Sequence, residues 1–196
     1  MTKRFFITLL LYHFLGVSLF CQFEEESWRF RPQIGLWFGP VTPFPGSALS
    51  YYLDTNLGGG IFWRMNLPSD TWRSEVGTSY SYYDSRFQSA LHTVPVYGAV
   101  DYLLPIELPL TFYAKLGFGA MYVFSEPNKR ENWHPLMLLG YEASFPAGKW
   151  VNIGARIDYF FVYEGYLRPP PHFPGYRVVN AHLLKFGLMV NFNLSR

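Results

Sequence analysis

The sequence predicts an all-β chain in which eight antiparallel strands close into an up-and-down transmembrane β-barrel, preceded by a cleavable signal peptide. Three observations lead to this prediction. The chain begins with a short apolar segment, eight later segments alternate large apolar residues with small or polar ones, and the connections between those segments alternate in length. Alternation with a period of two is typical of strands that have one apolar face.

The first 21 residues have the pattern of a secretory signal peptide, which leaves residues 22–196 as the barrel domain. Lys3 and Arg4 precede an apolar run of 16 residues, 5–20, and a glutamate run, Glu24–Glu26, follows soon after it. A membrane-spanning helix needs about 20 apolar residues, so this run fits a signal better than an anchor. Two alternatives stay open at its end: cleavage after Cys21, or a lipidated Cys21 as the first mature residue.

Composition excludes several classes of protein. The chain has 16 Lys and Arg against 14 Asp and Glu, and removing Lys3 and Arg4 leaves 14 of each sign. A neutral mature chain argues against nucleic acid as a partner. The single cysteine excludes a disulfide framework, and the histidines lack the spacing of metal ligands, so we expect no cofactor and no metal.

The eight predicted strands are each about ten residues long, which is what a tilted strand needs to cross a bilayer. In seven of them one face carries large apolar residues and the other carries glycine and polar residues. The fourth is apolar on both faces, so its register is ambiguous. The predicted strands cover residues 28–38, 57–65, 72–82, 91–102, 110–122, 137–145, 151–161 and 184–194.

The connections fit an outer-membrane topology. Those at about 41–55, 84–90, 125–135 and 165–177 are mostly longer than those at about 66–71, 103–109 and 146–149. Long outer loops and short periplasmic turns are typical of such barrels. Aromatic residues also gather near the predicted strand ends, from Trp63 and Trp150 on one rim to Phe38, Tyr122 and Tyr159 on the other. These two groups predict aromatic belts at two water–lipid interfaces.

Four segments carry a resemblance to a known family: HTVPVYGAVDY, FYAKLGFGAMYVF, VNIGARIDYFF and HLLKFGLMVNFNL. With the turns between them, the chain from about residue 27 to 194 resembles the small eight-stranded outer-membrane barrels of the OmpX and OmpA-transmembrane-domain type. The resemblance implies export to the outer membrane. It also implies outer-membrane lipid and the barrel-assembly machinery as partners.

The inward faces carry charges of both signs, and an unpaired charge inside a narrow barrel is costly. We therefore expect a salt-bridge network that fills the lumen, with Asp101 as a further candidate member. The alternatives are a narrow path for ions or a small cavity for a lipid or another ligand, for which the many inward glycines could make room. The predicted network comprises Arg29, Arg31, Arg64, Arg73, Glu75, Lys115, Glu142, Arg156, Asp158 and Lys185.

The outer loops are the second candidate site. Basic and aromatic groups there could bind lipid phosphate or an extracellular or host ligand, which suggests a structural, surface-interaction or adhesin-like role without chemistry. The candidate contacts in two of these loops are Lys129, Arg130, Trp133, Arg168, His172 and Arg177.

A lipid-modifying barrel enzyme is the least favoured alternative. It would need a serine or acid beside a histidine at one rim, and His182 is the histidine expected on a strand and facing inward. Its candidate partners are Ser79 or Ser81 with Glu164. The chain has no G-x-S-x-G or H-E-x-x-H pattern, so we expect no enzyme.

Overall fold

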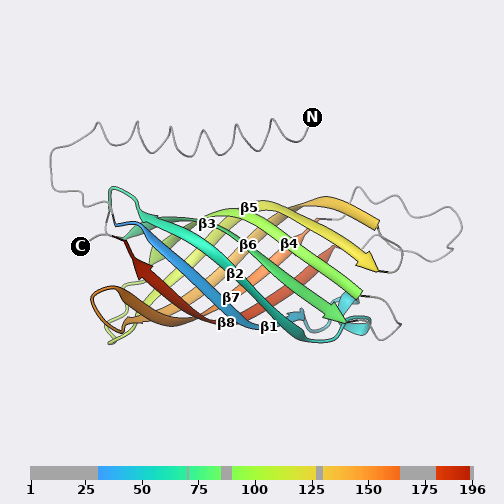
Figure 1. The fold of residues 1–196 in the computed structure, drawn as a ribbon, viewed down its shortest axis with the longest axis horizontal. Helices are drawn as coiled ribbons and strands as arrows, with labels where there is room; N and C mark the ends of the chain where they lie inside the picture. The colour runs from blue at the N-terminus through green and yellow to red at the C-terminus, as the bar shows by residue number, and fades with distance from the viewer. Residues whose placement is uncertain (1–30, 70, 85–89, 127–129, 164–179, 195–196) are drawn as a thin grey trace, which may run out of the picture. The chain divides into compact units, whose positions relative to one another are not determined.

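The computed structural model describes residues 31–69, 71–84, 90–126, 130–163 and 180–194. The predicted signal peptide and Arg29 lie outside this part of the chain. The described residues form eight antiparallel strands closed into a barrel, in which each strand pairs with its neighbours in sequence and the last pairs with the first (Figure 1). The strands are β1 (Gln33–Pro43), β2 (Asn56–Asn66), β3 (Trp72–Asp84), β4 (Ala90–Leu103), β5 (Thr111–Glu126), β6 (Arg130–Pro146), β7 (Val151–Val162) and β8 (Ala181–Asn193).

Closure is made by β1 and β8, the strands farthest apart in sequence. Their register runs from Gln33 opposite Asn193 to Pro43 opposite Leu183, and the Leu194 N–H extends it by donating to the Pro32 carbonyl at 2.9 Å. Each strand therefore has a hydrogen-bonding partner on both sides. Such closure removes sheet edges, which a bilayer without water does not tolerate.

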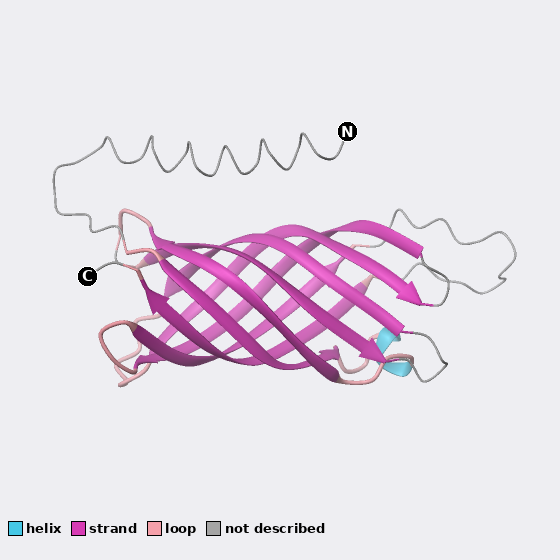
Figure 2. Cartoon of the chain, in the orientation of Figure 1, coloured by secondary structure: helices cyan, strands magenta, loops and turns pink. Residues whose placement is uncertain are grey.

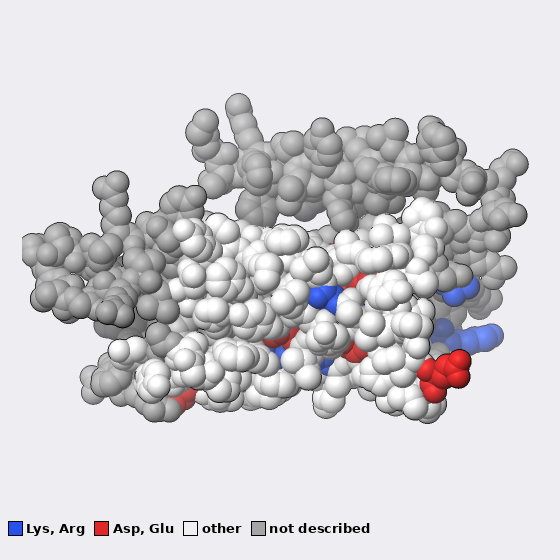
Figure 3. All heavy atoms as spheres, turned by 180° about the vertical axis from the view of Figure 1, so that it is seen from behind, with Lys and Arg blue, Asp and Glu red and all other residues white. Residues whose placement is uncertain are grey.

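The predicted alternation is confirmed on the barrel wall. On β5, the outward side chains of Leu116 and Phe118 are 49% and 62% exposed. The neighbouring Lys115 points to the other face of the strand and is buried. The ambiguous fourth segment also acquires a register, because Tyr97 and Asp101 are buried and face the lumen. Most of the wall drawn in Figure 3 is uncharged, as a surface in contact with acyl chains must be.

The first strand was predicted too early. It spans residues 33–43 instead of 28–38, because Pro40 and Pro43 resemble loop residues in the sequence but lie within β1. Proline lacks the N–H that a ladder needs. The β1–β8 pairing accommodates Pro40 by skipping from Phe38 opposite Leu188 to Val41 opposite Lys185. This shift moves Phe38 to the middle of β1, so its predicted place in an aromatic belt was wrong.

The predicted loop at 125–135 was also wrong in extent. β5 continues to Glu126 and β6 begins at Arg130, with Ser125 opposite Arg130 and Tyr122 opposite Trp133. Backbone pairing can continue beyond the apolar band, because polar side chains there face water and leave the ladder intact. Only residues 127–129 connect these two strands.

The two ends of the barrel differ. At the turn end, residues 67–71, 104–110 and 147–150 connect strands, and the first and last described residues also lie there. At the loop end, the segment between β1 and β2 contains a short 3-10 helix, η1 (Ala48–Tyr51), seen in Figure 2. Leu53 of this segment is buried in the interior core, and Leu49 packs against it. Within the described ranges, no helix has the length and apolar character to cross a membrane.

The outward aromatics of the described strands contact one another near both ends. Trp72 and Tyr102 lie with their ring centroids 4.8 Å apart at the turn end, and Tyr122 and Trp133 are 5.3 Å apart toward the loop end. Leu116, which pairs with Val100 and Leu139, lies between these two levels.

We predict that Leu116→Arg lowers the free energy of unfolding in lipid vesicles by about 2–4 kcal/mol, because it places a charge in the apolar band. Urea titration of the folded barrel, followed by its heat-modifiable migration on a gel, measures this loss. Ile34→Arg is the matched control: Ile34 pairs with Trp63 and Phe192 near the turn end, so we expect about 0–1 kcal/mol. Equal losses at both positions would contradict a depth-dependent, lipid-facing wall.

Candidate functional site: the barrel interior and its charge cluster

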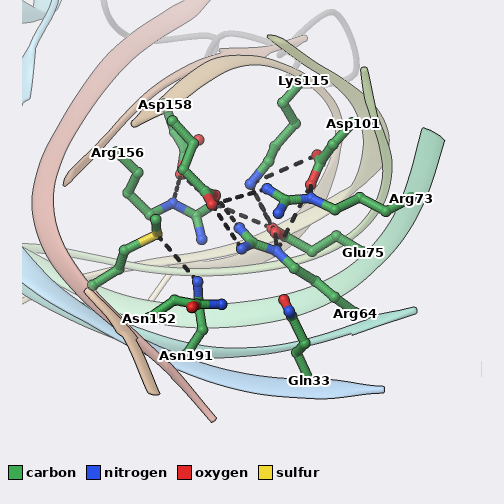
Figure 4. Close-up of polar contacts among 12 residues, drawn as sticks. Gln33, Arg64, Arg73, Glu75, Asp101, Lys115, Asn152, Arg156, Asp158 and Asn191 are labelled. Atoms are coloured by element: carbon green, nitrogen blue, oxygen red, sulfur yellow. Dashed lines mark hydrogen bonds and ion pairs between the residues drawn. The ribbon is translucent and has the colours of Figure 1, made fainter. Parts of the chain in front are cut away.

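Glu75 of β3 is the central acceptor of a buried charge cluster inside the barrel (Figure 4). Its carboxylate accepts from Arg64 Nε at 2.5 Å, from Lys115 Nζ at 2.8 Å and from Arg156 Nη2 at 3.2 Å. The Tyr97 hydroxyl also donates to it at 2.9 Å. Four strands therefore place donors on one carboxylate, which is fully buried.

Three further carboxylates extend the cluster across the lumen. The Glu142 carboxylate on β6 forms ion pairs with both Arg64 and Arg73, and Arg73 Nη2 lies 2.9 Å from Glu142 Oε1. Arg73 Nε reaches Asp101 at 2.8 Å. Arg156 pairs with Asp158, two residues along β7, at 2.6 Å. Strands β2 to β7 are thus cross-linked through their inward side chains.

The charges in this cluster balance. It contains four carboxylates, Glu75, Asp101, Glu142 and Asp158, and four cations, Arg64, Arg73, Lys115 and Arg156. Oxygens of Glu75, Asp101 and Glu142 lie within 4.8 Å of one another, a spacing at which carboxylates can hold a metal ion. Here guanidinium and ammonium groups already supply the positive charge between them. The arrangement is therefore chemically a salt-bridge network.

Aromatic rings line the cluster. The Arg64 guanidinium lies 4.1 Å from the centroid of the Phe62 ring, and the Arg156 guanidinium lies 4.8 Å from the same ring. On the turn-end side, Arg73 stacks 3.4 Å from the centroid of Tyr113. Such contacts stabilise a desolvated cation through the negative face of the ring.

The structure brings together seven of the ten residues predicted for the lumen network. The eighth, Lys185, is buried apart from the cluster, where its Nζ donates to Ser79 Oγ at 2.9 Å and lies 4.4 Å from the centroid of the Phe160 ring. Arg31 is exposed just before β1, because β1 begins later than predicted, so its assignment to the network was wrong. Arg29 lies outside the described residues. The seven are Arg64, Arg73, Glu75, Lys115, Glu142, Arg156 and Asp158.

Sequence reasoning did not identify the second layer of the interior. Toward the loop end most of the large inward side chains are apolar and pack into one buried core, with polar groups such as Thr93 and His134 among them. A signal was present, because Trp37, Met121 and Leu138 fall on the face of their strands that the alternation assigned to the lumen. The core residues include Trp37, Val41, Tyr83, Met121, Leu136, Leu138, Phe160, Val162 and Leu183.

The inward glycines accommodate this packing. A Cβ added at Gly77 would lie 2.5 Å from the Tyr97 hydroxyl oxygen, and one at Gly35 would overlap the Phe62 ring. At these two glycines, the space in which a small ligand cavity was considered is therefore filled by the aromatic side chains of Tyr97 and Phe62.

Among the described residues, the arrangement that the least favoured alternative, an enzyme, would need is not formed. His182 pairs with Phe161 on the outward face of β8, so its predicted inward orientation was wrong, and its Nδ1 lies 2.6 Å from the Tyr159 hydroxyl. Ser79 and Ser81 face the lumen and are buried. The reason for the outward orientation of His182 is its even-numbered position on β8, which it shares with the outward-facing Leu184 and Phe186. Glu164 lies outside the described residues.

The predicted outer-loop contacts fall mostly outside the described residues, which applies to Lys129, Arg168, His172 and Arg177. Arg130 is the first residue of β6 instead of a loop residue. Trp133 is on the outward face of β6 against Tyr122, which places it in the loop-end aromatic belt. The expectation that these two residues lie in a loop was therefore wrong.

Comparison with known proteins establishes the fold. No protein-family model and no curated protein sequence matches the chain. Among solved structures, Neisserial surface protein A (NspA) superposes with a TM-score of 0.52 and 12% identity over 84% of this chain and 97% of its own. The outer-membrane protein OprG from Pseudomonas aeruginosa superposes with a TM-score of 0.50 and 11% identity, over 85% of this chain and 96% of its own. The chain has the fold of the small eight-stranded outer-membrane barrels. At these identities the likeness of this barrel to its neighbours concerns the fold alone.

We predict that Glu75→Gln lowers the free energy of unfolding of this barrel by about 3–5 kcal/mol, because it leaves three buried cations without their shared carboxylate. Urea titration in lipid vesicles measures the change. The matched control is Glu107→Gln in the exposed turn between β4 and β5, which we expect to shift stability by less than about 0.5 kcal/mol. If the two variants were equally stable, the cluster would not hold the strands together.

Proposed function

We propose that this chain is an integral outer-membrane protein with a closed lumen, whose role is structural, surface-interacting or adhesin-like and involves no chemistry. One observation carries the proposal. The wall is apolar, while the interior is filled by an ion-paired layer and an apolar core stacked along the barrel axis. A barrel built in this way offers its partners the loop end and the turn end.

The interior argues against the alternative of a narrow pore. An ion that crossed the lumen would have to pass the cross-linked carboxylates and guanidinium groups around Glu75. It would then have to pass the core around Met121 and Phe160, where large buried side chains fill the lumen between polar groups such as Ser81, Thr93 and His134. An eight-stranded barrel has room for side chains and little else. The interior therefore supports an anchoring role in preference to transport.

We predict that the purified barrel, reconstituted in planar bilayers, gives no unitary conductance steps, because both interior layers block the lumen. Heat-modifiable migration of the reconstituted sample verifies that folded protein is present. A barrel of known conductance in the same bilayers is the positive control. Reproducible steps that depend on protein concentration would favour the pore.

The loop between β7 and β8 is the segment we propose for surface contact, on the basis of Arg168, His172 and Arg177 in a proline-rich sequence. Proline lowers the conformational entropy that a segment loses when it binds. We predict that replacing residues 168–177 by a Gly-Ser segment of equal length abolishes attachment of expressing cells to an immobilised extracellular matrix. Heat-modifiable migration should stay unchanged, because no described strand is altered. Undiminished attachment would contradict an adhesin-like role for this loop.

A further inference from the structure

The turn end of the barrel contains a cavity of about 440 Å³ that the closed-lumen function does not use. Its lining comes from both sides of the β1–β8 seam, from β2, β3, β5 and β7, and from the β6–β7 turn, so it occupies the turn-end mouth of the barrel, next to the charge cluster. The volume falls within the range of about 300–1,000 Å³ found for small-molecule sites.

The charged side chains that line this cavity are all basic. Arg31, Arg73 and Lys149 contribute to it, and none of the described lining residues is acidic. Arg73 already pairs with Asp101 and Glu142 in the charge cluster. Arg31 and Lys149 are exposed, and among the described residues no carboxylate oxygen lies within 4.0 Å of either. The mouth therefore carries two cations that the network does not neutralise.

Amide side chains complete the wall between these cations. Gln33 Nε2 donates to Asn193 Oδ1 at 2.8 Å, and Asn193 Nδ2 donates to the Lys149 carbonyl at 3.4 Å. These bonds hold the β1–β8 seam and the β6–β7 turn in one arrangement around the cavity. Gln33 and Asn152 lie beside the charge cluster in Figure 4. The cavity is thus preorganised, and amides can donate to an acceptor without adding charge.

We propose that this turn-end cavity binds a small organic oxyanion, a carboxylate or a phosphate ester, through Arg31 and Lys149, with Arg73 at its inner side. Guanidinium and ammonium groups donate charge-assisted hydrogen bonds to both kinds of anion. The Tyr113 ring and the amides offer contacts to an uncharged remainder of the ligand, and a cavity of this volume is larger than an inorganic ion requires. The site is at the opposite end from the outer loops, so its test is independent of the loop function.

The test uses the full barrel in neutral detergent micelles and measures binding of citrate and of glycerol 3-phosphate by titration calorimetry. We expect saturable binding of at least one probe, weakened by added salt, and none of glycerol. The double variant Arg31→Gln with Lys149→Gln should weaken the binding at least about tenfold, since each substitution removes a charge-assisted contact. Both residues are exposed, so we expect the folded barrel, checked by heat-modifiable migration, to persist.

The control is Lys129→Gln, which removes one positive charge from the segment that connects β5 and β6 in sequence and should leave the binding unchanged. A second arm repeats the titration in nanodiscs with and without phosphatidylglycerol. Competition by that lipid identifies a headgroup phosphate as the source of the anion, and its absence identifies a free solute. Failure of both probes to bind, or equal binding by the double variant and the unaltered chain, would overturn the proposal.

Discussion

A strand in a bilayer must satisfy every backbone N–H and carbonyl within the protein, and the rest of this structure depends on how β1 and β8 meet that demand. Their pairing closes the sheet, and closure directs alternate side chains into a lumen too narrow for water to fill freely. Each inward residue must therefore be matched by another. The charge cluster and the apolar core are the two ways in which this chain achieves that match.

The two interior layers have different consequences. The ion-paired layer around Glu75 joins strands β2 to β7 through side chains, in addition to the backbone ladders that join only neighbours. Its carboxylates and cations are balanced, and the desolvation of Glu75 and Glu142 is offset by more than one cation each. The core around Met121 and Phe160 fills the other half of the lumen, and the β1–β2 segment adds Leu49 and Leu53 to it. The turn-end mouth remains the part of the interior that is open and positively charged.

The location of the candidate site was predictable in part. Parity alone assigned Arg64, Glu75 and Lys115 to the lumen, because a period of two leaves no other face for them. Parity could not identify which carboxylate each cation contacts. Arg64 and Glu142 are 78 residues apart in sequence, and their contact depends on strand stagger and barrel closure. Asp101 was uncertain because the fourth segment is apolar on both faces.

The sequence by itself determined the number of strands, their antiparallel order and the face on which most side chains lie, since these follow from local alternation and from turn-forming residues. Only the tertiary structure decided that β1 continues to Pro43, because Pro40 lies where the β1–β8 ladder skips the two positions between Phe38 and Val41. It also decided that β1 begins only at Gln33, so that Arg31 lies before the strand and at the mouth of the barrel. These placements depend on register between strands, which is a long-range property that no local pattern encodes.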